Sequence, residues 1–558
     1  MAAVLRFYGL AWDGGISAHP DERYVVGVAE RLGCVQHGCV QHGYLDRLNP
    51  FALAPDYAYG HLPLYLLAGA TRLSGGADPL LVGRALAALF DLSAVALTFV
   101  LGRRVYRERV ALVAAAFVAV MVLHVQQAHF YTADALLPFF VLGTLLFAVR
   151  LAQGGGTGRR SVDAWLTGAW AGLALGTKLS AAFLALPVAV ALGTLKRNRW
   201  KGALRSGGGA LLAFAFTNPF ALLACPVFWR NVVEQAAMAR GALDLPYTRQ
   251  FHGTWPYVYP LVQQLRWGMG WPLGLLACGG LAQAVWRAVR EPPSPGEWVL
   301  LAWVVPSLAF VGALYAKFPR YLLPVTPLLA LYAARTLCSL SLGPWSQARR
   351  TLALSIASGV WVASFLLCLA VVNVYRFPHP WQAASAWFRG LGLCPDRVPG
   401  GAVVAVEQWD HPLPIETAGY EIRELPVFDE DTSDKWAAMA EGLAEADYVV
   451  IASRRGYATL ARWPERYPLM ADYYEQLFNG GLGFRPVACF GRAPRLGPVA
   501  LVDDPTAGLD FSLPGLCRPD APVVLRLGRL DESFVVYDHP QVVILERSGS
   551  LPPAGGGD

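Results

Sequence analysis

Long apolar runs are the feature of this 558-residue sequence that most constrains its fold. Ten runs between residues 80 and 375 reach or approach the ~20 residues that a helix needs to cross a bilayer. Only 15% of the residues are charged, against about 25% in a soluble globular protein. The sequence therefore predicts a polytopic α-helical membrane protein, with apolar runs at 80–102, 110–124, 133–151, 163–177, 179–195, 208–228, 271–288, 297–316, 321–340 and 351–375.

The pattern changes after Tyr375, where charged residues return and Pro and Gly become frequent. Strand-like runs, "AVVAVE" (402–407) and "DYVVIAS" (447–453), alternate there with the helical run "SDKWAAMAEGLAEA" (433–446). This alternation is typical of an α/β fold. We expect three parts: an outer-face loop region over 1–79, a helical bundle over 80–375, and a soluble α/β domain with a loose tail over 376–558.

The basic residues predict how the bundle is oriented. They gather in alternate loops, at 103–109, 159–160, 196–201, 287–290 and 349–350. Lys and Arg are enriched in cytoplasmic loops, so the other loops and the C-terminal domain are expected to be extracytoplasmic, in a bacterial cytoplasmic membrane. The stretch 165–195 is too short for two full crossings, which predicts a tight helical hairpin broken at "GTK" (176–178).

The first 79 residues contain no run long enough to span a bilayer. The run "HLPLYLLAGATRL" (61–73) has about 13 residues, too few for a crossing, and is expected to lie along the outer interface. This orientation places residues 1–79 outside, although an earlier helix would be needed to carry them across. We therefore expect that the first transmembrane helix is missing or truncated.

Ionisable side chains concentrate at the face predicted to be extracytoplasmic. Charged groups in or beside membrane segments are costly and mark candidate functional sites. Arg84 and Asp91 lie seven residues apart and therefore on one face of the first long helix. Carboxylates can act as a general base or help to hold a cation, and cationic side chains can bind a lipid phosphate. The other candidates are His19, Asp21, Glu22, His61, His124, His129, Asp134, Lys178, Lys317 and Arg320.

Several motifs resemble those of polyprenyl-phosphate-dependent glycosyltransferases of the GT-C type. The resemblance is to the bacterial branch that includes protein mannosyltransferases and aminoarabinose transferases. The motifs occur in order and cover most of the chain. They are "AHPDER" (18–23), "LNP" (48–50), "YGHLPLYLLAGATRLSG" (59–75), "LVGRALAALFDLSAVALTFVLGRRVY" (81–106), "AHFYTADALLPFF" (128–140), "GLALGTKLSAAFLALP" (172–187) and "FPRYLLPVTPLLALYAA" (318–334).

The resemblance implies an enzyme that moves a sugar from a polyprenyl-phosphate donor to a lipid, glycan or protein acceptor. The net charge of +6 is small for this length and does not indicate a nucleic-acid partner. The resemblance also implies that Asp21 is the catalytic base and that Glu22 contacts a metal or the acceptor. Asp134 matches a second acidic position. A divalent cation, Mg or Mn, would be held by Asp21 and Glu22. Donor phosphate contacts are implied for Lys178, Arg320, Tyr321 and Arg84, and substrate contacts for His19, His61 and His129.

Two other functions remain open at this stage. A transporter for a lipid or polar solute would also collect charges in a helical bundle, but it should show internal repeats with paired broken helices, and none is seen in the sequence. A non-catalytic membrane scaffold would not require the outer-face polar residues to converge.

The cysteines leave their pairing open. The block "CVQHGCVQHG" (34–43) duplicates five residues and could be a metal site, although a repeat expansion in a surface loop is the favoured interpretation. A disulfide is allowed there, or among Cys394, Cys489 and Cys517.

Overall fold

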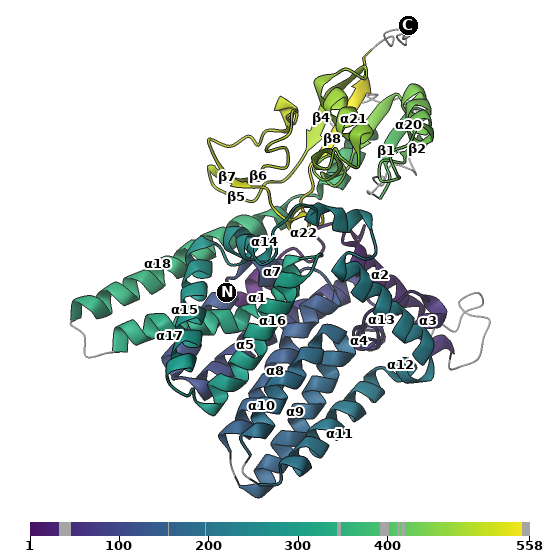
Figure 1. The fold of residues 1–558 in the computed structure, drawn as a ribbon. Helices are drawn as coiled ribbons and strands as arrows, with labels where there is room; N and C mark the ends of the chain where they lie inside the picture. The colour runs from purple at the N-terminus through teal and green to yellow at the C-terminus, as the bar shows by residue number, and fades with distance from the viewer. Residues whose placement is uncertain are drawn as a thin grey trace. The chain divides into compact units, whose positions relative to one another are not determined.

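A computed structural model describes residues 1–32, 46–154, 156–195, 197–342, 347–390, 401–409, 413 and 419–548 (Figure 1). The duplicated block at 34–43 and Cys394 lie outside these residues. Contacts divide the chain into two compact units. The first comprises residues 1–10, 19–243 and 255–369, and the second comprises 11–18, 244–254 and 370–558.

The first unit is built almost entirely of helices, which are coloured purple to green in Figure 1. All ten predicted apolar runs are helical, and some are broken. The helices are α1 (Ala2–Phe7), α2 (Pro20–Arg31), α3 (Pro50–Leu53), α4 (Leu62–Leu73), α5 (Pro79–Val105), α6 (Glu108–Ala119), α7 (Val122–Gln127), α8 (Ala133–Gln153), α9 (Thr157–Thr177), α10 (Ala185–Gly193), α11 (Arg199–Thr217), α12 (Pro219–Leu223), α13 (Cys225–Arg240), α14 (Val258–Gln263), α15 (Trp271–Arg290), α16 (Pro295–Ala313), α17 (Thr326–Leu342) and α18 (Gln347–Val372).

Five helical segments of the described chain are long and apolar enough to cross a membrane: Pro79–Val105, Ala133–Gln153, Trp271–Arg290, Pro295–Ala313 and Arg350–Phe388. The predicted run at 208–228 is wrong in its bounds, because α11 begins at Arg199 and ends at Thr217. Pro219 lies two residues after the end of α11, and a proline disfavours helical geometry in the residue before it, here Asn218. The fold class predicted from the sequence, a polytopic helical membrane protein, is confirmed.

The predicted break at "GTK" is confirmed. Helix α9 ends at Thr177, and Lys178 is extended, with φ −155° and ψ 132°, before the short 3-10 helix η2 (Leu179–Leu184) and α10. Helix α9 packs tightly against α11: a Cβ added at Gly168 would lie 1.9 Å from the carbonyl oxygen of Ser206. Small residues at such contacts let two membrane helices approach closely.

A network of buried charges joins the start of the chain to the bundle. Arg6 of α1 donates from Nε to Asp91 of α5 at 2.6 Å, and Asp91 also bonds His124 of α7 at 2.5 Å. His124 Nε2 lies 2.9 Å from the hydroxyl of Thr326, the first residue of α17. These side chains are at most 2% exposed, so each charge in the network is compensated by a neighbour rather than by water.

The second unit contains the α/β fold predicted for the C-terminal region. Its five-stranded sheet has the order β2-β1-β3-β8-β4, in which β1 runs parallel to β2 and β3 while β8 is antiparallel to β3 and β4. A smaller sheet has the order β5-β6-β7. The elements are α19 (Pro380–Phe388), β1 (Val403–Glu407), β2 (Glu421–Leu425), α20 (Ser433–Glu445), β3 (Tyr448–Ile451), α21 (Pro468–Asn479), β4 (Phe484–Phe490), β5 (Arg495–Leu496), β6 (Val499–Asp503), β7 (Val523–Gly528), α22 (Glu532–Val535) and β8 (Val542–Arg547).

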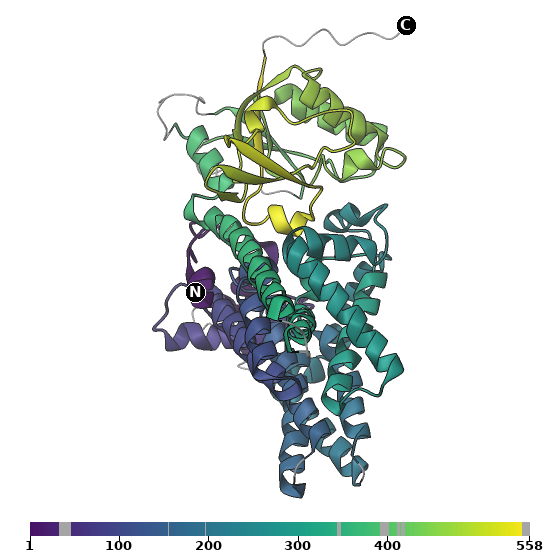
Figure 2. The ribbon, with the colours of Figure 1, turned by 90° about the vertical axis from the view of Figure 1, so that its left-hand side faces the viewer.

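Helices cover both faces of the larger sheet. In Figure 2 its strands lie between α19 on one side and α20 and α21 on the other. Strand β3 is buried along its whole length, as is the start of β8. Apolar residues at successive positions suit strands with two covered faces. A disulfide joins Cys489 at the end of β4 to Cys517, with the Cα atoms 5.2 Å apart. This is one of the pairings that the sequence left open.

Candidate active site

A partly buried ion pair between Asp134 and Lys178 lies at the centre of the candidate site in the first unit. Lys178 Nζ is 2.7 Å from one carboxylate oxygen of Asp134 and 2.9 Å from the other. Asp134 lies in the first turn of α8, whose N-cap Thr132 accepts from the backbone N–H of Ala135. Lys178 occupies the break between α9 and η2. The helix break thus places the ammonium beside the first turn of a neighbouring helix.

Arg320 joins this pair to the carboxylate of Asp21. Its Nη2 is 3.3 Å from Oδ2 of Asp21, and its Nε is 3.5 Å from Oδ2 of Asp134. Lys178 Nζ also lies 4.7 Å from the ring centroid of Tyr321, the residue after Arg320. The structure therefore brings together five of the predicted site residues, from four segments of the chain: Asp21, Asp134, Lys178, Arg320 and Tyr321. A scaffold would not require this convergence.

Local structure holds two of these segments in place. His19 caps α2 by accepting from the backbone N–H of Asp21 at 3.2 Å, and Pro20 follows at the first helical position, where its missing N–H costs nothing. Gly60 lies against Gly176 of α9: a Cβ at Gly60 would be 2.0 Å from the carbonyl oxygen of Gly176. This close approach brings Tyr59 beside Lys178, whose Nζ is 5.9 Å from the Tyr59 ring centroid.

The electrostatics of the cluster keep Asp21 ionised. Burial, the largest single effect, would raise the pKa of this carboxyl, but Arg320, His19, Lys178 and a hydrogen bond from Tyr59 together outweigh it, so the net pKa lies below the ordinary value of 3.8. The Asp21 side chain is 26% exposed. Asp21 therefore carries a negative charge at neutral pH and stays accessible.

A cavity of about 290 Å³ opens beside the cluster. Asp134 and Lys178 are the charged residues among those that line it, and Tyr59 and Tyr321 lie beside them. The rest of the lining is mainly apolar and comes from α8, α13, α16 and the segments around 179–183 and 321–325, with Leu137, Leu179, Phe183, Val232, Met238, Trp303, Phe310, Val311, Leu314 and Val325. The cavity thus combines an ion pair with an otherwise apolar wall.

Glu22 and Arg84, two other predicted site residues, pair with each other. Glu22 Oε2 lies 2.7 Å from Arg84 Nη2, and Oε1 accepts from Arg84 Nε at 3.0 Å and from the backbone N–H of Tyr131 at 2.8 Å. Arg84 also donates to the carbonyl of Leu10. Both side chains are fully buried. These contacts fix α2 to α5 and occupy groups that the sequence assigned to a metal, the acceptor or the donor phosphate.

The three histidines predicted as substrate contacts are buried in different surroundings. His19 packs against Phe130, with ring centroids 4.8 Å apart. His129 bonds the carbonyls of Val125 and Tyr8. His61 packs against aromatic rings such as Phe51, 5.1 Å away, and burial lowers its pKa to about 4. His61 therefore stays neutral at physiological pH.

The predicted metal ligands do not converge. Asp21 faces Arg320, whereas Glu22 is held by Arg84 and Tyr131. Within the described ranges, no group of three or more His, Cys, Asp or Glu side chains is placed to hold a metal ion. The arrangement of these two carboxylates does not fit a shared divalent cation, because each is already engaged by a different arginine.

Sequence reasoning missed Tyr59, which hydrogen bonds Asp21 and whose own pKa is raised well above 10, chiefly by burial and then by Asp21. The only local signal was its place next to Gly60 and His61 in the "YGHLP" motif. Nothing in that spacing indicates that the ring reaches a carboxylate in another helix.

The helical bundle and the α/β unit form a fold similar to that of two oligosaccharyltransferases of known structure. The apo structure of an oligosaccharyltransferase from Archaeoglobus fulgidus superposes with a TM-score of 0.53 at 15% identity, covering 88% of this chain and 74% of that one. The archaeal oligosaccharyltransferase AglB from the same organism, solved with an inhibitory peptide and a dolichol-phosphate, gives 0.52 at 16% identity, covering 93% and 74%. These matches show the fold.

Residues 60–222 match the family described as dolichyl-phosphate-mannose-protein mannosyltransferase. The chain is also 32% identical over 267 residues to an undecaprenyl phosphate-alpha-4-amino-4-deoxy-L-arabinose arabinosyl transferase from Pseudomonas fluorescens, covering 47% of this chain and 46% of the relative. The matched region thus spans about half the length of that relative. The resemblance predicted from the sequence, to the mannosyltransferase and aminoarabinose transferase type, is confirmed.

Proposed function

We propose that this protein transfers a sugar from a polyprenyl-phosphate donor to a hydroxyl group of an acceptor at the membrane surface. The observation that carries the proposal is the cavity of about 290 Å³, with its mainly apolar wall and the Asp134–Lys178 pair. A polyprenyl phosphate is an apolar chain that ends in an anion, so its two parts match the two parts of the cavity. The apolar wall suits the isoprenoid chain, and the charged part of the cavity suits its phosphate.

Lys178 and Arg320 are the groups proposed to hold the phosphate. Both contact Asp134. The Asp134 carboxylate therefore holds the two cations side by side before the donor binds. Cations fixed in advance stabilise the negative charge that grows on the phosphate as the sugar leaves, because little reorganisation is needed at that moment. Tyr321, beside Lys178, would line the same subsite.

Asp21 is the proposed general base. Its carboxylate is ionised and partly exposed, so it can take the proton of an acceptor hydroxyl. The acceptor oxygen then forms a bond to the anomeric carbon from the side opposite the phosphate. The bond between that carbon and the phosphate oxygen breaks, the electron pair stays on the released polyprenyl phosphate, and the sugar configuration is inverted.

The names of the relatives support the donor class. The Pseudomonas relative is named for undecaprenyl phosphate, and the AglB structure was solved with dolichol-phosphate and a peptide. The acceptor proposed here is a lipid, glycan or protein. No step is assigned to a divalent cation, because Asp21 and Glu22 point to different partners.

We propose a cytoplasmic-membrane location with the second unit on the extracytoplasmic side. The alternate placement of basic loops supports this orientation, with 103–109 and 287–290 on the cytoplasmic side. Donor and acceptor would then meet at the outer face.

A turnover assay tests the proposal. The purified protein is supplied with a panel of polyprenyl-phosphate sugars and native membrane extract, and mass spectrometry follows loss of sugar from each donor. We expect one donor to be consumed, and Asp21→Asn to abolish its consumption. Glu30→Gln, an exposed carboxylate change on the same helix, is the matched control and should retain turnover. Full turnover by a folded Asp21→Asn protein would refute the assignment of the base.

A further inference from the structure

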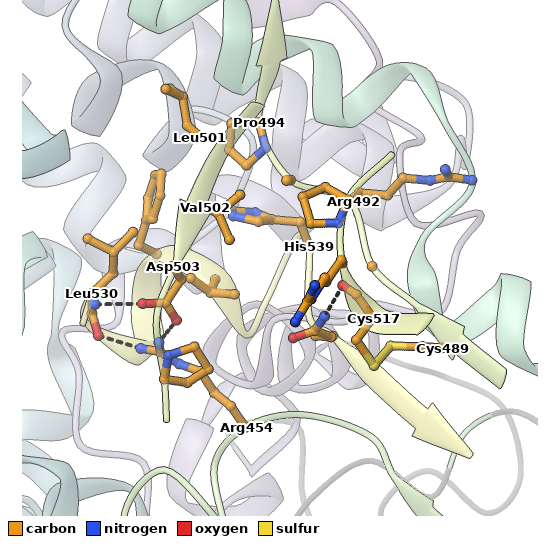
Figure 3. Close-up of a pocket in the computed structure, with 18 of the residues that line it drawn as sticks. Arg454, Cys489, Arg492, Pro494, Leu501, Val502, Asp503, Cys517, Leu530 and His539 are labelled. Atoms are coloured by element: carbon orange, nitrogen blue, oxygen red, sulfur yellow. Dashed lines mark hydrogen bonds and ion pairs between the residues drawn. A yellow bond between two sulfur atoms is a disulfide. The ribbon is translucent and has the colours of Figure 1, made fainter. Parts of the chain in front are cut away.

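A second cavity, of about 200 Å³, lies within the α/β unit at one edge of its larger sheet (Figure 3). Three connections meet at this edge because of the strand pairing: Ile451 at the end of β3 pairs with Val543 of β8, and Phe490 at the end of β4 pairs with Val542. The residues after β3, after β4 and before β8 therefore line one space.

The carboxyl ends of parallel strands from both sheets meet at this cavity. Strands β6 and β7 are parallel and end at Asp503 and Gly528, and β3 is parallel to β1. Arg454, just after β3, forms an ion pair with Asp503 and donates to the carbonyl of Leu530, while the N–H of Leu530 donates to Asp503 at 2.8 Å (Figure 3). Open α/β sheets bind ligands outside the carboxyl ends of their strands, so this edge is where a ligand is expected.

The lining carries an excess of positive charge. Three arginines, Arg454, Arg492 and Arg518, and two carboxylates, Asp503 and Asp520, are among the lining residues. Arg492 and Arg518 are exposed, and neither forms an ion pair with a carboxylate in the part of the chain that the structure describes. Their guanidinium groups can therefore bind an anion without first breaking an ion pair.

A further arginine, Arg462, contacts a residue of the cavity lining. Arg462 donates to the carbonyl of Pro505, a lining residue. The pKa of Arg462 is lowered to about 10, first by burial and then by its neighbours Arg529 and Arg454. A bound anion would offset this mutual repulsion.

The disulfide between Cys489 and Cys517 holds together the two segments that carry Arg492 and Arg518. Cys489 and Cys517 both line the cavity, and each lies close in sequence to an exposed arginine, Arg492 or Arg518. Gln541 adds a hydrogen bond to the carbonyl of Cys517 at 2.9 Å. The segment that carries Arg518 is thus attached covalently to the end of β4.

We propose that this cavity is a second binding site, which takes a phosphate or carboxylate group carried on a sugar-sized polar molecule. Arginine suits this ligand because its planar fork matches the oxygens of a carboxylate or phosphate. The volume accommodates an anionic group and part of a monosaccharide. The site belongs to the second unit alone and does not depend on the proposed sugar transfer.

Ligand titration of the full chain in phosphatidylcholine nanodiscs tests the proposal, with glucose 1-phosphate, inorganic phosphate and glucose as probes. We expect both phosphates to bind and glucose not to bind. Replacing Arg492 and Arg518 together by Gln should weaken the binding of glucose 1-phosphate by about tenfold or more, the loss of at least one charge-assisted contact. Arg485→Gln, an exposed arginine on β4 outside the lining, is the matched control and should bind as the wild type does.

Lys178→Met separates this site from the proposed donor site and should leave the binding of glucose 1-phosphate unchanged. The proposal is overturned if glucose binds as tightly as glucose 1-phosphate, if neither phosphate binds, or if the double arginine variant binds both phosphates as the wild type does. Because both arginines are exposed, their replacement should not prevent folding, and a thermal melt of the variant checks this.

Discussion

Glu22→Gln should destabilise the protein strongly without touching the proposed chemistry. Glu22 accepts hydrogen bonds from Nε and Nη2 of Arg84 and from the N–H of Tyr131, and it is fully buried. Glutamine has the same size, so the change creates no cavity. It removes the negative charge and turns an N–H donor toward the guanidinium, which then keeps Leu10 as an acceptor but loses its counter-charge.

The expected cost is about 3–5 kcal/mol, the usual effect of removing one partner of a buried ion pair. Thermal unfolding in detergent, followed by tryptophan fluorescence, measures the loss. Asp21→Asn is the matched control at the adjacent position. Its ion pair with Arg320 is longer, at 3.3 Å, and Asp21 is partly exposed, so the change should cost no more than about 1 kcal/mol while it abolishes turnover.

A third variant isolates the buried charge as the cause. Adding Arg84→Met to Glu22→Gln removes the unpaired guanidinium and should recover part of the lost stability, because an uncompensated buried charge is the main source of the cost. A Glu22→Gln protein that melts like the wild type but has lost turnover would refute this reasoning. Such a result would return Glu22 to the metal or acceptor role that the sequence suggested.

Three further predictions follow from the site and the two units. Lys178→Met should lower turnover of the polyprenyl-phosphate donor between about 10- and 100-fold, through the loss of charge-assisted contacts, as measured by the same mass-spectrometric assay; unchanged kinetics would exclude Lys178 from phosphate binding. Burial lowers the pKa of His61 from 6.5 to about 4, so the unfolded chain takes up a proton at this residue before the folded protein does. The free energy of unfolding should therefore be unaffected by His61 above pH 6.5 and should fall by up to about 3 kcal/mol as the pH drops toward 4. Melts of wild type and His61→Phe between pH 7 and 4.5 check this, and parallel pH profiles would count against it. Reducing the disulfide between Cys489 and Cys517, 28 residues apart, should destabilise the second unit by roughly 3–4 kcal/mol, as seen in melts with and without reductant; a Cys489→Ser protein should not respond to reductant.

Much of the fold could be predicted because membrane helices and buried strands leave direct patterns in the sequence. The apolar runs located the helices of the bundle. The break at Lys178 followed from the length of the segment 165–195, which is too short for two crossings. Breaks inside runs were harder to predict, since Asn218 interrupts a stretch that is apolar on both sides.

Five residues of the candidate site were predicted from the sequence, but the partner that each carboxylate meets was not. Asp21 and Glu22 are adjacent on one helix, and neighbours at this spacing point in different directions. One therefore reaches the cluster at Arg320 while the other enters the bundle and meets Arg84. Which of the two carboxylates meets Arg320 and which meets Arg84 depends on how α2 is rotated against α5. That rotation is set by tertiary packing, which the local pattern does not record.

The two buried charges of α5 have a consequence for the order in which the chain is made. Arg84 pairs with Glu22, and Asp91 pairs with Arg6. Both counter-charges lie upstream, so each is synthesised before the helix that needs it. When α5 leaves the ribosome, partners for Arg84 and Asp91 have already emerged. Assembly of this helix in the bilayer, where an unpaired charge is costly, need not wait for any later part of the chain to supply a counter-charge.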